Sequence, residues 1–181
     1  MTKKIIITGG LGYIGTELCK IYSGYSWNDK ITVVDNRFIS ERVNQLRNWN
    51  IEFIYGDILD RDLVFKYFSD ADVVHHLAGI TDVPRTKTES DTARDAKIKQ
   101  VAEEGTQNIL DAIPTKCKII FPSTHVVYEG IKEVKKDISE EEELNPLLSY
   151  ATSKANNEKA NQRVWKKICY FKIRFSLWLF H

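Results

Sequence analysis

Cysteine is scarce in this chain, with Cys19, Cys117 and Cys169 widely separated among 181 residues. This number and spacing exclude a disulfide-stapled scaffold and a cysteine-ligated zinc site. We therefore expect a cytoplasmic, reduced protein that binds no metal.

An excess of one charge is also lacking, because 26 Lys and Arg residues nearly balance 25 Asp and Glu residues. The balance excludes a broad basic surface for nucleic acid. With 43% hydrophobic residues, the composition is that of an ordinary soluble domain. An anionic ligand would therefore have to be held by local groups.

Long hydrophobic runs are missing at both ends. Residues 1–4 lead directly into a short β-branched run, which leaves no room for a secretory signal. The apolar residues 177–180 are too few to span a bilayer. We predict one domain with a sizeable core and no membrane span.

Short apolar runs, most of them β-branched, alternate along the chain with segments of helical period such as 98–112 and 150–165. This alternation predicts βαβ units around a parallel sheet that is covered on both faces. The runs are 4–8, 31–34, 51–55, 73–77, 118–121 and 168–175.

Several single residues also carry predictions. Asp60 and Ser40 each precede a helical segment and are expected as N-caps. The aromatic residues 65, 67 and 68 have helical spacing and are expected in the core. His75 and His76 are neighbours in a strand, so they should point to opposite faces and not share a metal ion.

Residues 5–15 run from a buried strand through Gly9, Gly12 and Gly15 into a helix. Gly9 would allow a sharp turn, Gly12 a close approach of backbone N–H groups to a phosphate, and Gly15 tight packing of the helix. The helix N-terminus would then face the anion. The segment is interpreted as a cradle for a dinucleotide pyrophosphate, although such glycine clusters also form ordinary turns.

Asp35 follows Gly15 by twenty residues and ends the second strand, where a carboxylate would reach the ribose hydroxyls of NAD. An acid at this position repels a 2′-phosphate and so favours NAD over NADP. The alternative is that Asp35 and Asn36 only begin a turn. Asp57, after the third strand, is a candidate partner of the adenine amine or another turn residue.

Tyr150 and Lys154 are four residues apart and would share one face of a helix. A neighbouring ammonium together with an oxidised nicotinamide would lower the pKa of the phenol and make Tyr150 a usable base. Ser123 and Thr124, at the end of the fifth strand, add hydroxyls that would bridge substrate and phenol. The Tyr-x-x-x-Lys pattern also occurs on many helix surfaces.

Taken together, these motifs resemble the extended short-chain dehydrogenase/reductase superfamily, and within it the NAD-dependent epimerase/dehydratase family of nucleotide-sugar enzymes. The resemblance implies a Rossmann-type doubly wound parallel sheet of about six to seven strands in a three-layer α/β/α arrangement. The motifs are Thr-Gly-Gly-Leu-Gly-Tyr-Ile-Gly (8–15), Val-Asp-Asn (34–36), Gly-Asp (56–57), His-Leu-Ala-Gly (76–79), Pro-Ser-Thr-His-Val-Val-Tyr (122–128) and Tyr-x-x-x-Lys (150–154).

The same resemblance implies a role for each matching residue. Thr124, Tyr150 and Lys154 would be catalytic, with Tyr150 exchanging a proton with a sugar hydroxyl while hydride moves to NAD. Ser123 would lie beside the nicotinamide. The residues implied for cofactor binding are Gly9, Gly12, Tyr13, Ile14, Gly15, Asp35, Asn36, Asp57, Ile58, Leu77, Ala78, Gly79, Ser123, Tyr150 and Lys154.

The family continues into a smaller C-terminal part that binds the nucleotide sugar, whereas this sequence departs from the family pattern after Arg174. We therefore expect an NAD-binding domain over 1–175 and a tail over 176–181. The activities left open are a UDP-glucose 4-epimerase-like or dehydratase reaction, reduction of a non-sugar ketone or steroid, and a non-catalytic NAD-binding module. The resemblance also implies a homodimer through the helices near 98–113 and 150–165.

Overall fold

The computed structural model describes residues 2–25, 28–81, 91–132, 138–139, 142–164 and 169–173. Strands and helices alternate along these segments, as the sequence pattern predicts. The elements are β1 (Lys4–Thr8), α1 (Tyr13–Ser23), β2 (Lys30–Asp35), α2 (Ser40–Asn48), β3 (Glu52–Tyr55), α3 (Arg61–Phe68), β4 (Val73–His76), α4 (Thr92–Ala112), β5 (Lys118–Thr124), the 3₁₀ turn η2 (His125–Tyr128), α5 (Ser149–Val164) and β6 (Cys169–Ile173).

The strands form one six-stranded sheet in the order β3-β2-β1-β4-β5-β6. Every neighbouring pair is parallel, so the α/β doubly wound fold expected from the sequence is confirmed. Thr8, the last residue of β1, pairs with Val34 on one side and His76 on the other. The order reverses at this central strand, which is where ligands bind in open α/β sheets.

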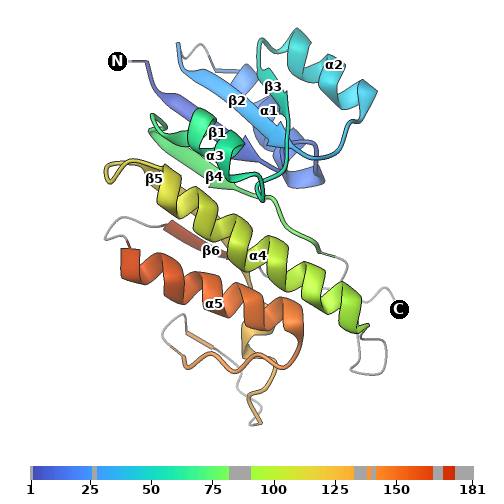
Figure 1. Cartoon of the computed structure of the whole chain (residues 1–181), viewed down its shortest axis with the longest axis vertical. Coiled ribbons are helices and arrows are strands. Elements are labelled where there is room, and N and C mark those ends of the chain that lie inside the picture. Colours follow the sequence, from blue (N-terminus) through green and yellow to red (C-terminus); the bar gives the residue numbers. More distant parts are fainter. Residues whose placement is uncertain are drawn as a thin grey trace.

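Helices cover both faces of the sheet. Successive side chains of β1 point to opposite faces and therefore contact different helices. Ile5 and Ile7 belong to a core cluster with α1 and α2. Ile6 belongs to a second cluster with α3 and α4. Figure 1 shows α4 and α5 lying side by side. Residues of α4 belong to the core cluster with β1, β4 and β5, and α5 packs on β5.

Of the two predicted N-caps, one is confirmed. The Asp60 carboxylate accepts a hydrogen bond from the backbone N–H of Leu63 at the start of α3. The Ser40 prediction is wrong, because Ile39 takes the extended N-cap conformation and Ser40 is already helical. Its hydroxyl therefore turns to the Glu41 carboxylate, 3.4 Å away.

The aromatic residues of α3 are only partly in the core. Phe68 is fully buried and Tyr67 packs against the core cluster. The prediction for Phe65 is wrong, since its side chain is 38% exposed and lies under the guanidinium of Arg61. Val64 and Phe68, four residues apart on one face of α3, take the fully buried positions, and Phe65 lies on a more outward face.

His75 and His76 lie on opposite faces of β4, as predicted. His75 Nε2 is 2.7 Å from the hydroxyl of Tyr22 on α1. His76 lies between Thr8 of β1 and Thr106 of α4. Its Nδ1 is 2.9 Å from the hydroxyl oxygen of Thr8, and its Nε2 is 3.0 Å from that of Thr106. The two rings therefore cannot ligate one metal ion together.

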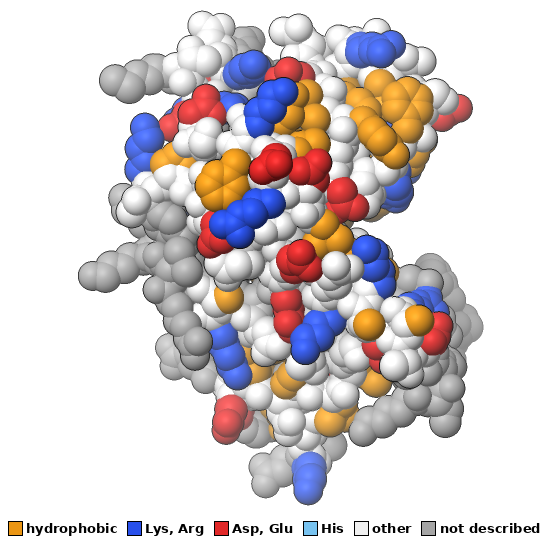
Figure 2. Space-filling model, viewed as in Figure 1, with side chains coloured by type: hydrophobic (Ala, Val, Ile, Leu, Met, Phe, Trp, Pro, Cys, Tyr) orange, Lys and Arg blue, Asp and Glu red, His pale blue; other side chains and the backbone are white. Residues whose placement is uncertain are grey.

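The surface carries no large field of one sign on the face shown in Figure 2, where acidic and basic side chains are interspersed. Within the segments described above, no helix is both long and apolar enough to cross a membrane.

Replacing Gly9 by alanine should destabilise the fold by about 2 kcal/mol or more. Gly9 has a φ of +67°, and a Cβ there would lie 2.8 Å from the backbone Cα of Ala78. Gly24→Ala is the matched control, because its nearest contact would be 3.5 Å and its φ is −79°. Urea unfolding would measure both variants. Equal stabilities for Gly9→Ala and the wild type would contradict the strained turn.

The fold should lose stability as the pH falls from about 6.5 to 4. Burial lowers the pKa of His75 to about 4 and that of His76 to about 3. Both rings stay neutral in the folded chain, whereas the unfolded chain takes up protons below pH 6.5. Each histidine should contribute a slope of about 1.4 kcal/mol per pH unit in this window.

Urea unfolding at a series of pH values would measure this slope. His75→Gln should reduce it, and His125→Gln, at an exposed position, is the matched control. An unchanged slope in His75→Gln would show that this histidine does not contribute to acid destabilisation.

Candidate functional site

A cavity of about 880 Å³ opens where the strands of the sheet end at their carboxyl termini. It is lined by α1, by the end of β2 and by the segments that follow β1, β3 and β4. The ends of β5 and residues of α4 and α5 complete the wall. Every site residue predicted from the sequence lies on its wall, so the structure brings all of them together. They are Gly9, Gly12, Tyr13, Ile14, Gly15, Asp35, Asn36, Asp57, Ile58, Leu77, Ala78, Gly79, Ser123, Thr124, Tyr150 and Lys154.

The glycine loop turns sharply into α1. The Gly12 N–H donates to the Gly9 carbonyl oxygen at 2.9 Å, which closes the turn. A Cβ on Gly15 would lie 2.6 Å from the Cα of Gly10, so only glycine lets the helix approach the loop this closely. α1 has no side-chain cap and no acidic residue in its first turn. Its N-terminus is therefore suited to an anion.

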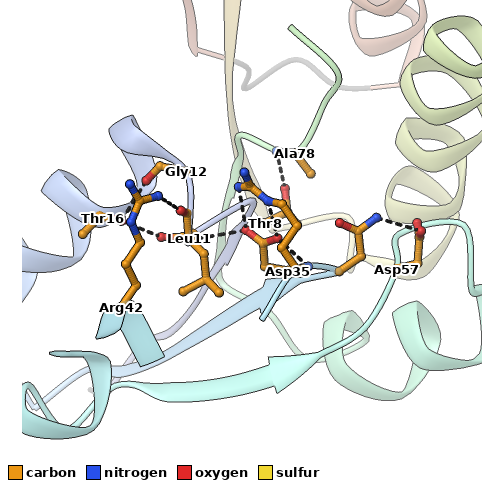
Figure 3. Close-up of polar contacts among 11 residues, drawn as sticks. Thr8, Leu11, Gly12, Thr16, Asp35, Arg42, Asp57 and Ala78 are labelled. Carbon is orange, nitrogen blue, oxygen red and sulfur yellow. Dashed lines mark hydrogen bonds and ion pairs between the residues drawn. The ribbon is translucent and has the colours of Figure 1, made fainter. Parts of the chain in front are cut away.

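Asp35 is held firmly at the end of β2, and its side chain is buried. One carboxylate oxygen accepts the N–H of Leu11 at 2.9 Å, and the other accepts the N–H of Arg37 at 3.0 Å. The Arg37 guanidinium pairs with the same carboxylate, at an Nε to Oδ1 distance of 3.3 Å. Figure 3 shows this carboxylate beside the loop, together with Arg42, which donates from α2 to the Leu11 carbonyl oxygen.

Asn36 and Asp57 face each other at the ends of β2 and β3. The Asn36 amide donates to Oδ2 of Asp57 at 2.9 Å (Figure 3). The other oxygen of Asp57 accepts the N–H of Leu59 at 3.0 Å. This arrangement points a fixed carboxylate and an amide at the same end of the cavity as Asp35.

The backbone that follows β4 forms another wall of the cavity. The N–H of Ala78 donates to the hydroxyl of Thr8 at 3.0 Å, a contact drawn in Figure 3. The N–H of Leu77 donates to the carbonyl oxygen of the same threonine. Residues 77–79 are thereby fixed to the end of β1.

Lys154 reaches from α5 to the end of β5. Its Nζ donates to the carbonyl oxygen of Pro122 at 3.0 Å and lies 4.3 Å from the centroid of the Phe121 ring. The same Nζ is 5.9 Å from the centroid of the Tyr150 ring. The expected pairing of Tyr150 and Lys154 on one helical face is therefore present.

Burial changes the pKa of both residues. It lowers the pKa of Lys154 to about 8, and the negative charge of Glu158 acts against this decrease. Burial also raises the pKa of Tyr150. In the chain alone, the ammonium therefore does not lower the pKa of the phenol, and the lowering expected from the sequence would depend on the cationic nicotinamide.

Ser123 and Thr124 differ in what their hydroxyls contact. Thr124 Oγ1 accepts the N–H of Val126 at 3.4 Å and caps η2, while its side chain lines the cavity. The Ser123 hydroxyl donates to the carboxylate of Glu158 on α5. Ser123 therefore lies on the cavity wall, as expected, but its hydroxyl is directed at α5.

Sequence reasoning missed three charged residues near the cavity. Arg37 and Lys97 line it, and Glu158 lies behind Ser123. The spacing of Glu158, four residues after Lys154, was a signal that could have identified it. Arg37 and Lys97 had no comparable local pattern.

Comparison with known proteins agrees with this geometry. A model of the NAD dependent epimerase/dehydratase family matches residues 5–175. The dTDP-D-glucose 4,6-dehydratase of Dictyostelium discoideum is 31% identical over 181 residues, covering 91% of this chain and 41% of that protein. The UDP-N-acetyl-alpha-D-glucosaminuronate decarboxylase of Bacillus cytotoxicus is 34% identical over 132 residues, covering 71% and 38%.

The fold is also found among solved structures. The UDP-glucose 4-epimerase from Brucella ovis, solved in complex with NAD, superposes with a TM-score of 0.72 and 28% identity. The match covers 90% of this chain and 47% of that one. The chain spans less than half the length of each of these three proteins. With the family model matching most of its residues, the chain belongs to the NAD dependent epimerase/dehydratase family.

Proposed function

We propose that this chain binds NAD and takes part in the epimerase- or dehydratase-type oxidoreduction of a nucleotide sugar, similar to that of a UDP-glucose 4-epimerase. The observation that carries this proposal is the set of residues that share the cavity described above. It has the glycine loop, Asp35 and Asp57 at one end, and Thr124, Tyr150 and Lys154 at the other. A dinucleotide needs such an elongated site, because its adenosine and nicotinamide ends bind far apart.

The residues at the adenosine end fit NAD. The uncapped N-terminus of α1 suits the pyrophosphate. The turn before it has no room for a side chain at Gly9 or at Gly15. Asp35 presents a fixed carboxylate to the ribose hydroxyls. Asn36 would also contact the ribose, and Asp57 and Ile58 would contact the adenine. The neighbouring Arg37 adds a positive charge close to the phosphates.

At the other end, Tyr150 would remove a proton from a sugar hydroxyl and later return one. Lys154 would hold the ribose next to the nicotinamide and stabilise the phenolate by its charge. The Thr124 hydroxyl would hold the substrate oxygen close to the phenol. NAD supplies the hydride chemistry, accepting hydride from the sugar and giving it back.

The substrate class rests on the relatives. The similar protein of Dictyostelium discoideum is named for a reaction of a dTDP-linked sugar. Those of Bacillus cytotoxicus and Brucella ovis are named for reactions of UDP-linked sugars. We extend this class to the present chain as a proposal.

A non-catalytic NAD-binding module is the second candidate. It is favoured by the raised pKa of Tyr150, since a phenol that stays protonated near neutral pH is a poor base. This candidate predicts tight NAD binding without turnover.

Asp35→Asn should weaken NAD binding about tenfold or more, because hydrogen bonds to a charged group contribute about 1.5–3 kcal/mol. Titration calorimetry would measure the dissociation constant, with urea unfolding of the same sample to check the fold. Asp62→Asn, at an exposed position on α3, is the matched control. Unchanged NAD affinity in Asp35→Asn would contradict the placement of the ribose.

The same experiment continues with UDP-glucose and dTDP-glucose in the presence of NAD. Tyr150→Phe should keep NAD affinity and lose turnover by about a hundredfold or more. If the wild type binds NAD but converts neither sugar, the non-catalytic candidate is favoured. If the wild type does not bind NAD, both candidates are wrong.

We also propose that the chain is cytoplasmic and pairs as a homodimer through α4 and α5. The two helices pack against each other, and Asn156 donates to the Glu103 carboxylate at 2.9 Å where they meet. Their outward positions are exposed and mostly polar, including Lys99, Gln107 and Thr152. The free, buried thiols of Cys19 and Cys117 suit a reducing compartment.

Because the outward positions are polar, such a dimer should weaken when Gln107→Glu and Thr152→Glu add like charges across the symmetry axis. Sedimentation velocity at micromolar concentration should show a dimer for the wild type and more monomer for the double variant. Glu17→Gln on α1 is the control, since α1 lies on the other face of the sheet. A monomeric wild type would disprove the dimer.

A further inference from the structure

Glu158 is a buried acidic residue to which the proposed chemistry gives no role. Its side chain lies on α5 and only 4% of the residue is exposed. A carboxylate removed from water is costly unless hydrogen bonds or an opposite charge stabilise it. Its partners should therefore explain why it is there.

The first partner is Ser123 on β5, whose hydroxyl donates to Oε1 of Glu158. Ser123 directly follows Pro122, whose carbonyl oxygen accepts a hydrogen bond from the Lys154 ammonium. Two successive turns of α5 are thus bound to two successive residues at the end of β5. The contacts fix the height of α5 against the strand that carries Thr124.

Glu158 also acts on Lys154, which lies one helical turn earlier and therefore on the same face of α5. The charge of Glu158 raises the pKa of Lys154, whereas burial lowers it to about 8. Because burial is what lowers this pKa, a nearby carboxylate favours the protonated ammonium.

The other titratable groups around Lys154 do not supply this negative charge. Tyr150 on α5 has a pKa raised by burial, and His76 on β4 is neutral because burial lowers its pKa to about 3. His125 of η2 and Lys97 of α4 line the same cavity, and neither side chain is an acid. Asp35 ends β2 and Asp57 follows β3, on the other side of β1 from β5, at the adenosine end.

We propose that Glu158, anchored by Ser123, is a positioning residue that holds the Lys154 ammonium in place beside Tyr150. The inference rests on the proposed function for its catalytic meaning, because Lys154 acts there as a cation. Ser123 accordingly contacts α5 through its hydroxyl while it lines the cavity.

The test measures the ionisation of Lys154 directly in the full chain. Acetic anhydride acetylates only the neutral amine, so the pH dependence of labelling, read by mass spectrometry of the Lys154 peptide, gives the midpoint. Glu158→Gln should move this midpoint about 1 pH unit lower, which is about a fivefold increase in labelling rate at pH 7. Glu158→Asp should restore part of the difference. Glu104→Gln, exposed on α4, is the matched control and should leave the midpoint unchanged.

Ser123→Ala provides a second, less disruptive variant, since it keeps the carboxylate and removes only its anchor. It should move the midpoint in the same direction as Glu158→Gln by a smaller amount. Urea unfolding of each variant separates folding from ionisation. Lowered stability with an unchanged midpoint in both variants would overturn the proposal and leave Glu158 as a structural link between α5 and β5.

The labelling experiment needs no cofactor and no turnover, so its result is separate from that of the proposed function. NAD binding adds a further measurement. If the wild type binds NAD, Glu158→Gln should weaken binding more at pH 8.5 than at pH 6.5, because the variant loses the ammonium at lower pH. Equal weakening at both pH values would contradict the role of Glu158 in keeping Lys154 charged.

Discussion

The architecture depends on one buried chain of hydrogen bonds that joins two neighbouring strands of the sheet to two helices. Thr8 of β1, His76 of β4, Thr106 of α4 and Asn157 of α5 are linked by contacts of 2.9 to 3.0 Å. All four are buried, so breaking any link would leave an unpaired polar group away from water. Thr8 also receives the Ala78 N–H, and the chain therefore connects the placement of α5 to the cavity wall after β4.

Much of the fold could be predicted because its determinants are local. The β-branched strands, the helical period between them and the Asp60 cap each depend on residues close in sequence. The predictions failed where a neighbour decided the outcome. Ile39 adopted the capping conformation in place of Ser40, and Val64 took the inward position in place of Phe65.

The candidate site divides in the same way. Gly9, Asp35 and Thr124 follow strand ends, and parallel strands bring their carboxyl ends to one edge, so their meeting could be predicted. Glu158 could not be assigned a role, because its partner Ser123 is 35 residues away on another element. The direction of the Tyr150 pKa depends on burial, which a linear pattern does not reveal.

The contacts of α5 make the site sensitive to helical register. Tyr150, Lys154 and Glu158 are spaced by four residues, so an α-helix places each about 6 Å further along the axis. Inserting or deleting one residue between Tyr150 and Lys154 would rotate Lys154 and Glu158 by about 100° relative to Tyr150. The connection before α5, in contrast, can vary in length without changing their mutual arrangement. A change in the length of this connection during evolution would therefore leave Tyr150, Lys154 and Glu158 in the same positions relative to one another.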